Sequence, residues 1–308
     1  MKGILKNIFT KKPKIIVILG QTSTGKTSLS IDVAKRFRGE VISADSRQVY
    51  QGLDLGSGKV TSEEMDGVPH HMIDVTHPKE IFSVQQFVEQ GTKAINKILK
   101  NKKNVIICGG TGAYIDALVN NDSFPAVPPN YELRSILEKK NTTELFDLLR
   151  EKDFSRSQSI DQHNKVRLVR ALEIIEAVGH VPSPNPQKSP YKVLYVGLRL
   201  DKETLHANIH NRIVTRLEQG MLDEAKNLYR DGLSYKRMEQ LGLEYRFMAQ
   251  HLKGEINHTE MIEGLNIATR QFAKRQNTWF KRNSKIQWFH PQDDKDLIMK
   301  NISRFLKR

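Results

Sequence analysis

The sequence is poor in cysteine and lacks any long hydrophobic run. Its 308 residues include one cysteine, Cys108, so the chain can form neither an internal disulfide nor a cysteine-based zinc site. No stretch approaches the roughly 20 consecutive apolar residues that a membrane-spanning helix needs. Internal repeats and extended low-complexity segments are also absent. We therefore expect a soluble, monomeric protein of the reducing cytoplasm.

Acidic residues are outnumbered by basic ones. The chain has 49 Lys and Arg against 35 Asp and Glu, a formal net charge of +14 and a pI near 9.7. This charge favours an extended polyanion as partner, although a basic enzyme without such a partner would have the same composition. The length allows one large domain or two modest ones. Residues 1–12 are predicted to form a loose basic arm.

The segment 18–30, ILGQTSTGKTSLS, has the G-x-x-x-x-G-K-T spacing of a phosphate-binding P-loop. It follows a continuous apolar run at 14–20, typical of a buried parallel strand, and precedes a helical pattern. A strand, a glycine-rich loop and a helix N-terminus together direct backbone N–H groups at phosphate oxygens. Lys26 would neutralise phosphate charge, and the Thr27 hydroxyl would bind Mg²⁺. The residues expected to hold a diphosphate or triphosphate are Gly20, Gln21, Thr22, Ser23, Thr24, Gly25, Lys26 and Thr27.

The order of apolar runs predicts the fold class. Further buried strands are expected at 40–44, 104–110, 191–200 and 285–290, and helical patterns separate most of them. This alternation indicates an α/β fold, a doubly wound parallel sheet that binds ligands at the C-terminal ends of its strands. The alternation breaks at 121–190, where helical patterns lie between two proline-rich segments. We predict a P-loop core of 13–120 and 191–308 with an all-helical insertion domain at 121–190.

The predicted core lacks two features of nucleotide hydrolases. A nucleoside triphosphatase usually has a strand that ends in a Mg²⁺-binding acidic residue, whereas the strand at 104–108 is followed by Gly-Gly-Thr-Gly, with Thr111 at its centre. The carboxylate is instead Asp45, which follows the apolar run at 40–44. A guanine-reading N/T-K-x-D element is also absent, which disfavours a GTPase-like module. These absences suggest chemistry other than attack of water on phosphorus.

A cluster of His70, His71 and His77 in PHHMIDVTHP invites a metal-site interpretation. No spacing in it matches a recognised zinc site, and adjacent histidines point in different directions. Structural histidines near the edge of the core are the favoured interpretation.

Basic and aromatic residues alternate in ATRQFAKRQNTWFKRN, at 268–283. On a helix, one face would carry Arg270, Lys274, Asn277 and Lys281, with Phe272, Trp279 and Phe280 interleaved. Such a surface suits nucleic acid, because charges meet phosphates and rings stack on bases. The alternative is a solvated amphipathic helix with Phe272 and Trp279 in the core. The further basic segment KVRLVRALE and the overall charge favour nucleic acid.

Taken in order, these segments resemble the bacterial tRNA dimethylallyltransferases, also called isopentenyl-diphosphate:tRNA transferases. The matching pieces are GQTSTGKT, ISADSRQVYQGLDLGSGK, GVPHHMIDV, GGTGAY, VRLVRALEI, LEQGMLDEAKNL and TRQFAKRQNTWF. The chain departs from the family pattern at Gln21 and Ser23–Thr24, at Ala113, and at QLGLEYRFM, where a Gly-Tyr-Lys/Arg segment is usual. We assign no role to QLGLEYRFM from the resemblance.

The resemblance implies transfer of a dimethylallyl group from dimethylallyl diphosphate to the N6 amine of adenosine-37, next to the tRNA anticodon. Asp45 would be the general base, while Lys26, Thr111 and Arg270 would act on the leaving diphosphate with Mg²⁺. Ser46 and Gln48 would read the extruded base. Residues implied in tRNA binding are Asp45, Ser46, Arg47, Gln48, Thr111, Arg134, Val166, Arg167, Leu168, Val169, Arg170, Lys274, Arg275 and Gln276. The alternatives are an ATP-dependent P-loop kinase of a small metabolite and a non-catalytic RNA-binding GTPase-like module.

Overall fold

The computed structural model describes residues 12–122, 124–125, 127–182 and 189–307, so nearly all of the predicted N-terminal arm lies outside it. The chain divides into two compact units. The first comprises Met1–Asn121 and Lys188–Arg308, and the second comprises Asp122–Gln187, which falls within the predicted insertion at 121–190.

The first unit is built on a six-stranded parallel sheet in the order β3-β2-β4-β1-β5-β6. The strands are β1 (Lys14–Gly20), β2 (Gly39–Ser43), β3 (His70–His71), β4 (Asn104–Gly109), β5 (Lys192–Leu198) and β6 (Ile286–Phe289). The last six residues of β1 are buried, which explains its continuous apolar run. All five residues of β2 are buried too, including Glu40 and Ser43. The predicted α/β fold with a parallel sheet is confirmed.

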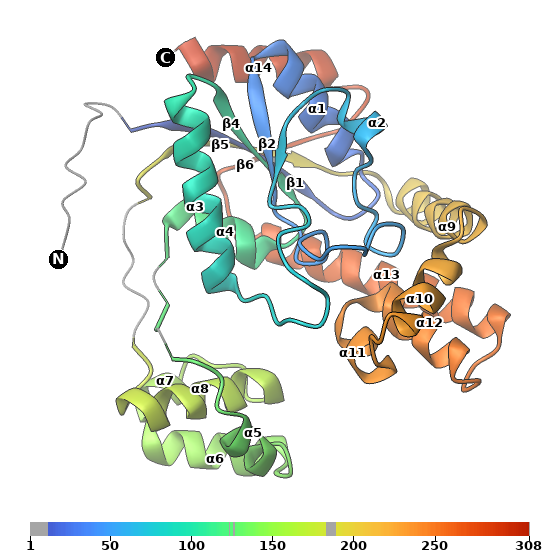
Figure 1. Ribbon diagram of the computed structural model, residues 1–308. Coiled ribbons are helices and arrows are strands. Elements are labelled where there is room, and N and C mark those ends of the chain that lie inside the picture. Colours follow the sequence, from blue (N-terminus) through green and yellow to red (C-terminus); the bar gives the residue numbers. More distant parts are fainter. Residues whose placement is uncertain (1–11, 123, 126, 183–188, 308) are drawn as a thin grey trace. The chain divides into compact units, whose positions relative to one another are not determined.

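Helices cover both faces of the sheet (Figure 1). One face packs against α1 (Lys26–Arg36) and α14 (Lys295–Lys307), with residues such as Leu29 and Ile298 in the core. The other face packs against α3 (Val84–Lys100) and α4 (Gly112–Asn120). The doubly wound arrangement leaves the C-terminal ends of the central strands open to a ligand site.

The rest of the first unit is a group of helices that extends the core on the second face. They are α9 (Lys202–Glu218), α10 (Met221–Arg230), α11 (Tyr235–Gln240), α12 (Leu243–Leu252) and α13 (His258–Phe280). The short helix α2 (Ser62–Met65) is not part of this group and lies between β2 and β3 in the chain. The helix α13 carries the alternating basic and aromatic segment. Arg270 and Lys274 are exposed on it, whereas Phe280 is buried.

In its described residues, the second unit has four helices around its own small core. They are α5 (Tyr131–Leu137), α6 (Thr142–Lys152), α7 (Phe154–Ser157) and α8 (Lys165–Val178). Leu145, Leu149 and Leu168 are fully buried at the centre of this core. Beside it, the buried carboxylate of Glu173 binds Arg134 and Arg170 at 2.7 and 3.0 Å.

The structure adds elements that the sequence pattern did not predict. The strand β3 is a pair of histidines at the sheet edge, so it has no apolar run. The helices α11, α12 and α14 also went unpredicted. The six-residue α11 is too short to show a clear period, whereas α14 has apolar residues at helical spacing, at Ile298, Ile302 and Phe305, which could have indicated it. None of the helices in the described ranges has both the length and the apolar character needed to cross a membrane.

Candidate active site

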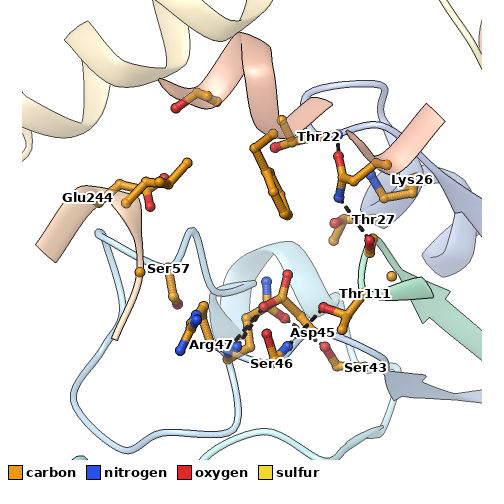
Figure 2. Close-up of a pocket in the computed structure, with 18 of the residues that line it drawn as sticks. Thr22, Lys26, Thr27, Ser43, Asp45, Ser46, Arg47, Ser57, Thr111 and Glu244 are labelled. Atoms are coloured by element: carbon orange, nitrogen blue, oxygen red, sulfur yellow. Dashed lines mark hydrogen bonds between the residues drawn. The ribbon is translucent and has the colours of Figure 1, made fainter. Parts of the chain in front are cut away.

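A cavity of about 570 Å³ opens in the first unit where the P-loop and the ends of β2 and β4 meet. Figure 2 shows Thr22, Lys26 and Thr27 on one side and Ser57 and Glu244 on the other, with Asp45, Ser46 and Thr111 between them. The cavity therefore joins the predicted phosphate site to the predicted general base.

The P-loop has the backbone conformation that its glycines predict. Gly20 and Gly25 have φ of 148° and 80°, in the region that glycine adopts most easily. A side chain at Gly20 would collide with the carbonyl oxygen of Leu198 on the neighbouring strand. Ser23 shares the left-handed conformation, with φ of 60°, and its buried Oγ has no hydrogen-bond partner in the described structure. The loop then runs directly into the N-terminus of α1, where anions are favoured.

Lys26 is partly buried beside this loop and donates to the carbonyl oxygen of Gln21. Burial lowers the pKa of its ammonium to about 8, and the positive charge of Arg212 contributes, while Cys108 and Asp45 oppose the shift. An ammonium that is costly to bury gains most from a nearby anion. Lys26 is thus suited to pairing with phosphate oxygens.

The helix α13 holds the P-loop in place through glutamine side chains. Gln276 Oε1 accepts a hydrogen bond from the Thr22 backbone N–H at 2.8 Å, and Gln276 Nε2 donates to the Gly110 carbonyl at 2.9 Å. Gln21 Nε2 donates to the Ala273 carbonyl at 3.1 Å. Gln276 is 6% exposed, so its amide orders the site in addition to lining it.

Asp45 closes a turn immediately after β2. Its Oδ1 accepts hydrogen bonds from the backbone N–H of Arg47 at 2.8 Å and of Gln48 at 3.4 Å. The neighbouring Ser46 N–H donates to Thr111 Oγ1 at 3.2 Å, which brings the turn against the Gly-Thr-Gly segment after β4. The Asp45 carboxylate and the Thr111 hydroxyl therefore lie together at the C-terminal ends of β2 and β4. A carboxylate can accept a proton, and a hydroxyl can bind a polar substrate atom.

Two arginines of α9 line the same cavity, and the sequence analysis did not single them out. Arg212 and Arg216 lie one helical turn apart. Burial lowers the pKa of both, to about 10 for Arg216, where Arg212 adds to the effect. Arg216 Nη1 is 3.7 Å from Glu244 Oε1, and burial raises the pKa of that carboxyl although Arg216 opposes the shift. Two guanidiniums with one carboxylate leave a positive charge that suits an anionic ligand.

The structure brings many of the predicted residues to this cavity. Those that line it are Thr22, Lys26, Thr27, Asp45, Ser46, Arg47, Gln48, Thr111, Arg275 and Gln276. Phe272 and Trp279 line it too, and the Trp279 indole N–H donates to Asp116 at 2.8 Å. The predicted contacts Arg270 and Lys274 lie on the exposed face of α13 and are not among the lining residues.

The remaining predicted tRNA contacts belong to the second unit. Val166 and Arg167 are exposed there, at the start of α8. Leu168 and Val169 are buried in its core, at 0% and 6% exposure, so their side chains are not presented at the surface, and their part in tRNA binding stays a prediction. Successive side chains point in different directions around a helix, so Leu168 and Val169 can face the core while Val166 and Arg167 remain exposed. Arg134 and Arg170 keep partly exposed guanidiniums, although both bind Glu173.

The histidine cluster forms no metal centre within the ranges that the structure describes. His71 Nε2 lies 2.7 Å from Glu40 Oε2, and His70 Nδ1 lies 2.9 Å from the Val68 carbonyl. Each histidine thus has one ring nitrogen near an oxygen atom of the protein, whereas the buried Nε2 of His70 has no hydrogen-bond partner in the described residues. His70 also lines the cavity.

Comparison with known proteins agrees with this geometry. Residues 48–283 match the family model described as IPP transferase. The chain is 42% identical over 286 residues to tRNA dimethylallyltransferase 2 of Treponema denticola, covering 90% of this chain and 96% of the relative. It is 37% identical over 286 residues to the tRNA dimethylallyltransferase of Anoxybacillus flavithermus, covering 91% of each chain.

Solved structures show the same similarity. The crystal structure of a tRNA isopentenylpyrophosphate transferase from Bacillus halodurans has a TM-score of 0.73 and 35% identity, covering 96% of this chain and 97% of that one. A eukaryotic dimethylallyltransferase, described as acting on tRNA, has a TM-score of 0.80 and 26% identity, covering 94% and 78%. The chain, with its P-loop and Asp45 on one cavity, therefore belongs to the IPP transferase family.

Proposed function

We propose that this chain transfers the dimethylallyl group of dimethylallyl diphosphate to the N6 amine of adenosine-37, next to the tRNA anticodon, and releases diphosphate. Membership of the IPP transferase family and relatives named as tRNA dimethylallyltransferases support this function. The same findings favour it over a small-metabolite kinase. The observation that carries it is a single cavity lined both by the P-loop Lys26 and by the Asp45 carboxylate.

The diphosphate of the donor would lie on the P-loop. Its oxygens would bind backbone N–H groups at the start of α1, Lys26 and the two arginines that line the cavity, Arg212 and Arg216. Charge on the diphosphate increases as the carbon–oxygen bond breaks. Fixed positive groups in a partly buried cavity stabilise that developing charge more than they would in water. The exposed Arg270 would contribute from outside the cavity wall.

The acceptor amine would lie against Asp45. The lone pair of an adenine amine is delocalised into the ring, so a base that accepts its proton assists attack on carbon. The electron pair of the amine forms the new carbon–nitrogen bond, the carbon–oxygen bond breaks, and the amine proton passes to Asp45. Thr111 and Ser46 flank this position, and the adenosine must leave the anticodon-loop stack to reach it.

Mg²⁺ would bind at the mouth of the P-loop. Thr27 is exposed and lines the cavity, so its hydroxyl is available as a ligand. Across the described ranges no group of three acidic, histidine or cysteine side chains could enclose a metal. This fits Mg²⁺, which usually keeps waters and binds through few protein ligands together with substrate phosphates. When bound, the ion would neutralise charge on the leaving diphosphate.

The second unit would grip the anticodon stem-loop. Its exposed Tyr131 and Val166, at 67% and 79% exposure, and the neighbouring Arg167 combine stacking, apolar and basic groups. The donor identity, the monomeric state and the cytoplasmic location stay predictions.

An acceptor experiment tests the proposal. The chain is incubated with dimethylallyl diphosphate, Mg²⁺ and an unmodified anticodon stem-loop, and the released nucleosides are analysed by mass spectrometry. We expect N6-dimethylallyl adenosine from the stem-loop with adenosine at position 37 and none from a matched stem-loop with guanosine there. Equal modification of both, or of neither, would contradict the proposed function.

A further inference from the structure

One carboxylate anchors the turn at 54–58. Glu224 on α10 accepts hydrogen bonds from three consecutive backbone N–H groups: Oε2 from Asp54 at 3.0 Å and Leu55 at 2.7 Å, and Oε1 from Gly56 at 3.0 Å. Successive N–H groups that converge on an anion form a nest, and hydrogen bonds to an ionised group are stronger than neutral ones. The position of this turn therefore depends on Glu224.

Tyr245 on α12 also binds the Glu224 carboxylate and thereby helps to hold the turn. Its hydroxyl donates to Glu224 Oε1 at 2.6 Å, and the side chain is 1% exposed. Burial raises the pKa of Tyr245 well above its usual value, so the hydroxyl remains a donor. The Tyr245 ring also packs so closely on Gly56 that a side chain there would collide with it. This contact gives the QLGLEYRFM stretch, which the family resemblance left without a role, a physical function.

The anchored turn presents Gly58 to the cavity arginines. The Gly58 carbonyl accepts hydrogen bonds from Arg212 Nη2 at 3.3 Å and from Gln48 Nε2 at 3.0 Å. Gly58 has φ of 59°, and the guanidiniums of Arg212 and Arg216 lie so close to its α-carbon that any side chain would overlap them. Gly58 thus holds the Arg212 guanidinium through its carbonyl, and the Arg216 guanidinium lies against the same glycine.

We propose that Glu224, assisted by Tyr245, is a positioning residue that holds the 54–58 turn and, through Gly58, sets Arg212 and Arg216 for the diphosphate. This inference rests on the proposed function, which places diphosphate in the cavity. Glu224 itself is not among the residues that line the cavity. Its effect follows because electrostatic stabilisation requires charged groups that are already fixed before the reaction.

Binding of inorganic pyrophosphate to the full chain, measured by calorimetry with Mg²⁺, tests this role. Glu224→Gln retains the side-chain shape but turns an amide N–H group toward the backbone donors. We expect its Kd to rise about tenfold, in line with the loss of hydrogen bonds to a charged group. Tyr245→Phe, which removes one donor, should raise the Kd less. Thermal melting of each variant verifies that it is folded.

Asp223→Asn is the matched control. Asp223 lies next to Glu224 on α10 but is 70% exposed and pairs with Lys226 at 2.8 Å, so the substitution removes the same charge without touching the turn. Wild-type pyrophosphate affinity is expected for this variant. A folded Glu224→Gln protein with wild-type affinity, or an equal loss in Asp223→Asn, would overturn the inference.

A double-mutant cycle identifies the route of the effect. If Glu224 acts through the arginines, Glu224→Gln should change pyrophosphate affinity much less in an Arg212→Gln background than in the wild type. Strictly additive losses would overturn the inference. Prenyl transfer by the wild type is assayed separately with tRNA. Its absence would overturn the proposed function, whereas transfer together with unaltered pyrophosphate binding by Glu224→Gln would overturn only the positioning role.

Discussion

The Asp45 carboxylate accepts a hydrogen bond from the backbone N–H of Arg47, 2.8 Å away, so it shapes the turn as well as facing the cavity. These two roles can be separated by substitution. Asparagine retains the carbonyl oxygen that accepts from Arg47 but cannot act as a base, whereas alanine loses both properties.

We expect Asp45→Asn to remove general-base catalysis while tRNA and diphosphate binding survive. The single-turnover rate of prenyl transfer should fall by roughly 10²–10⁴, the usual range for loss of a general base. Asp45→Ala should be at least as slow and should also be less stable. A single-turnover rate for Asp45→Asn within about threefold of wild type would exclude the base role.

Lys26 should make diphosphate binding sensitive to alkaline pH. Burial lowers the pKa of Lys26 to about 8, so in the free protein the side chain is mostly charged below that pH and mostly neutral above it. Pyrophosphate affinity of the wild type should therefore fall as the pH increases from 7 to 9.5, beginning near pH 8.

Lys26→Arg is the control for this effect, because a guanidinium keeps its charge throughout that range. Pyrophosphate itself changes charge over this pH range, but this affects both proteins equally and cancels in the ratio of their affinities. The ratio of wild-type to Lys26→Arg affinity should decrease above pH 8. A ratio that stays constant across the range would show that Lys26 does not titrate there.

Glu173 should control the stability of the second unit. Its side chain is fully buried, and it accepts from the Asn130 backbone at 2.8 Å and from Arg134 and Arg170. Although burial alone would raise the pKa of Glu173, hydrogen bonds from Arg134, the Asn130 backbone and Arg170 lower it overall. Removing one partner of a buried pair typically costs about 3–5 kcal/mol. We expect Glu173→Ala to lower the free energy of unfolding of this unit by that order.

The pH dependence of Glu173 has a definite sign. Because its pKa is lower in the folded state, its contribution is present above the unfolded value of 4.5 and is lost as the pH falls through the folded value. Stability measured by denaturant titration should thus decline faster in acid for the wild type than for Glu173→Ala. Parallel acid dependence of the two proteins would contradict this account.

Arg167 should contribute one phosphate contact to tRNA binding. It is exposed, unlike Leu168, and its loss should leave the fold of the second unit unchanged. We expect Arg167→Ala to flatten the dependence of log affinity on log salt by roughly one unit. Arg304→Ala removes an exposed charge from α14 and should leave the slope as in the wild type. An unchanged slope for Arg167→Ala would exclude the contact.

Arg170 requires a different expectation from Arg167. The family resemblance implied both arginines in tRNA binding, but Arg170 donates to Glu173 at 3.0 Å and to the Val127 carbonyl at 2.7 Å. Substitution of Arg170 therefore removes hydrogen bonds within the second unit. We expect it to lower the melting temperature as well as the tRNA affinity.

The sequence predicted those parts of the fold that local patterns determine. Strands buried on both faces, such as β1 and β4, have continuous apolar runs, and the P-loop combines fixed spacing with a preceding strand and a following helix. The two-residue strand β3 has no such pattern, because His70 and His71 are polar and pair only with β2.

Site residues that depend on tertiary contacts were harder to predict. Gln276 binds the Thr22 backbone across 254 positions of sequence, and nothing local to either residue predicts that hydrogen bond. Arg212 and Arg216 did carry a signal, since two arginines at i and i+4 share a helix face with the buried Ile209 and Ile213 close by. On a chain of net charge +14, that signal was hidden among many solvated basic residues.

Transfer from two labelled donors tests the central claim most directly. The chain is given tRNA and Mg²⁺ with dimethylallyl diphosphate labelled in its carbon group and, in parallel, with ATP labelled at its terminal phosphate. The account predicts label in tRNA from dimethylallyl diphosphate alone, with release of one diphosphate per group transferred and a strong loss in Asp45→Asn. Phosphate label transferred from ATP, with no carbon label in tRNA, would contradict it.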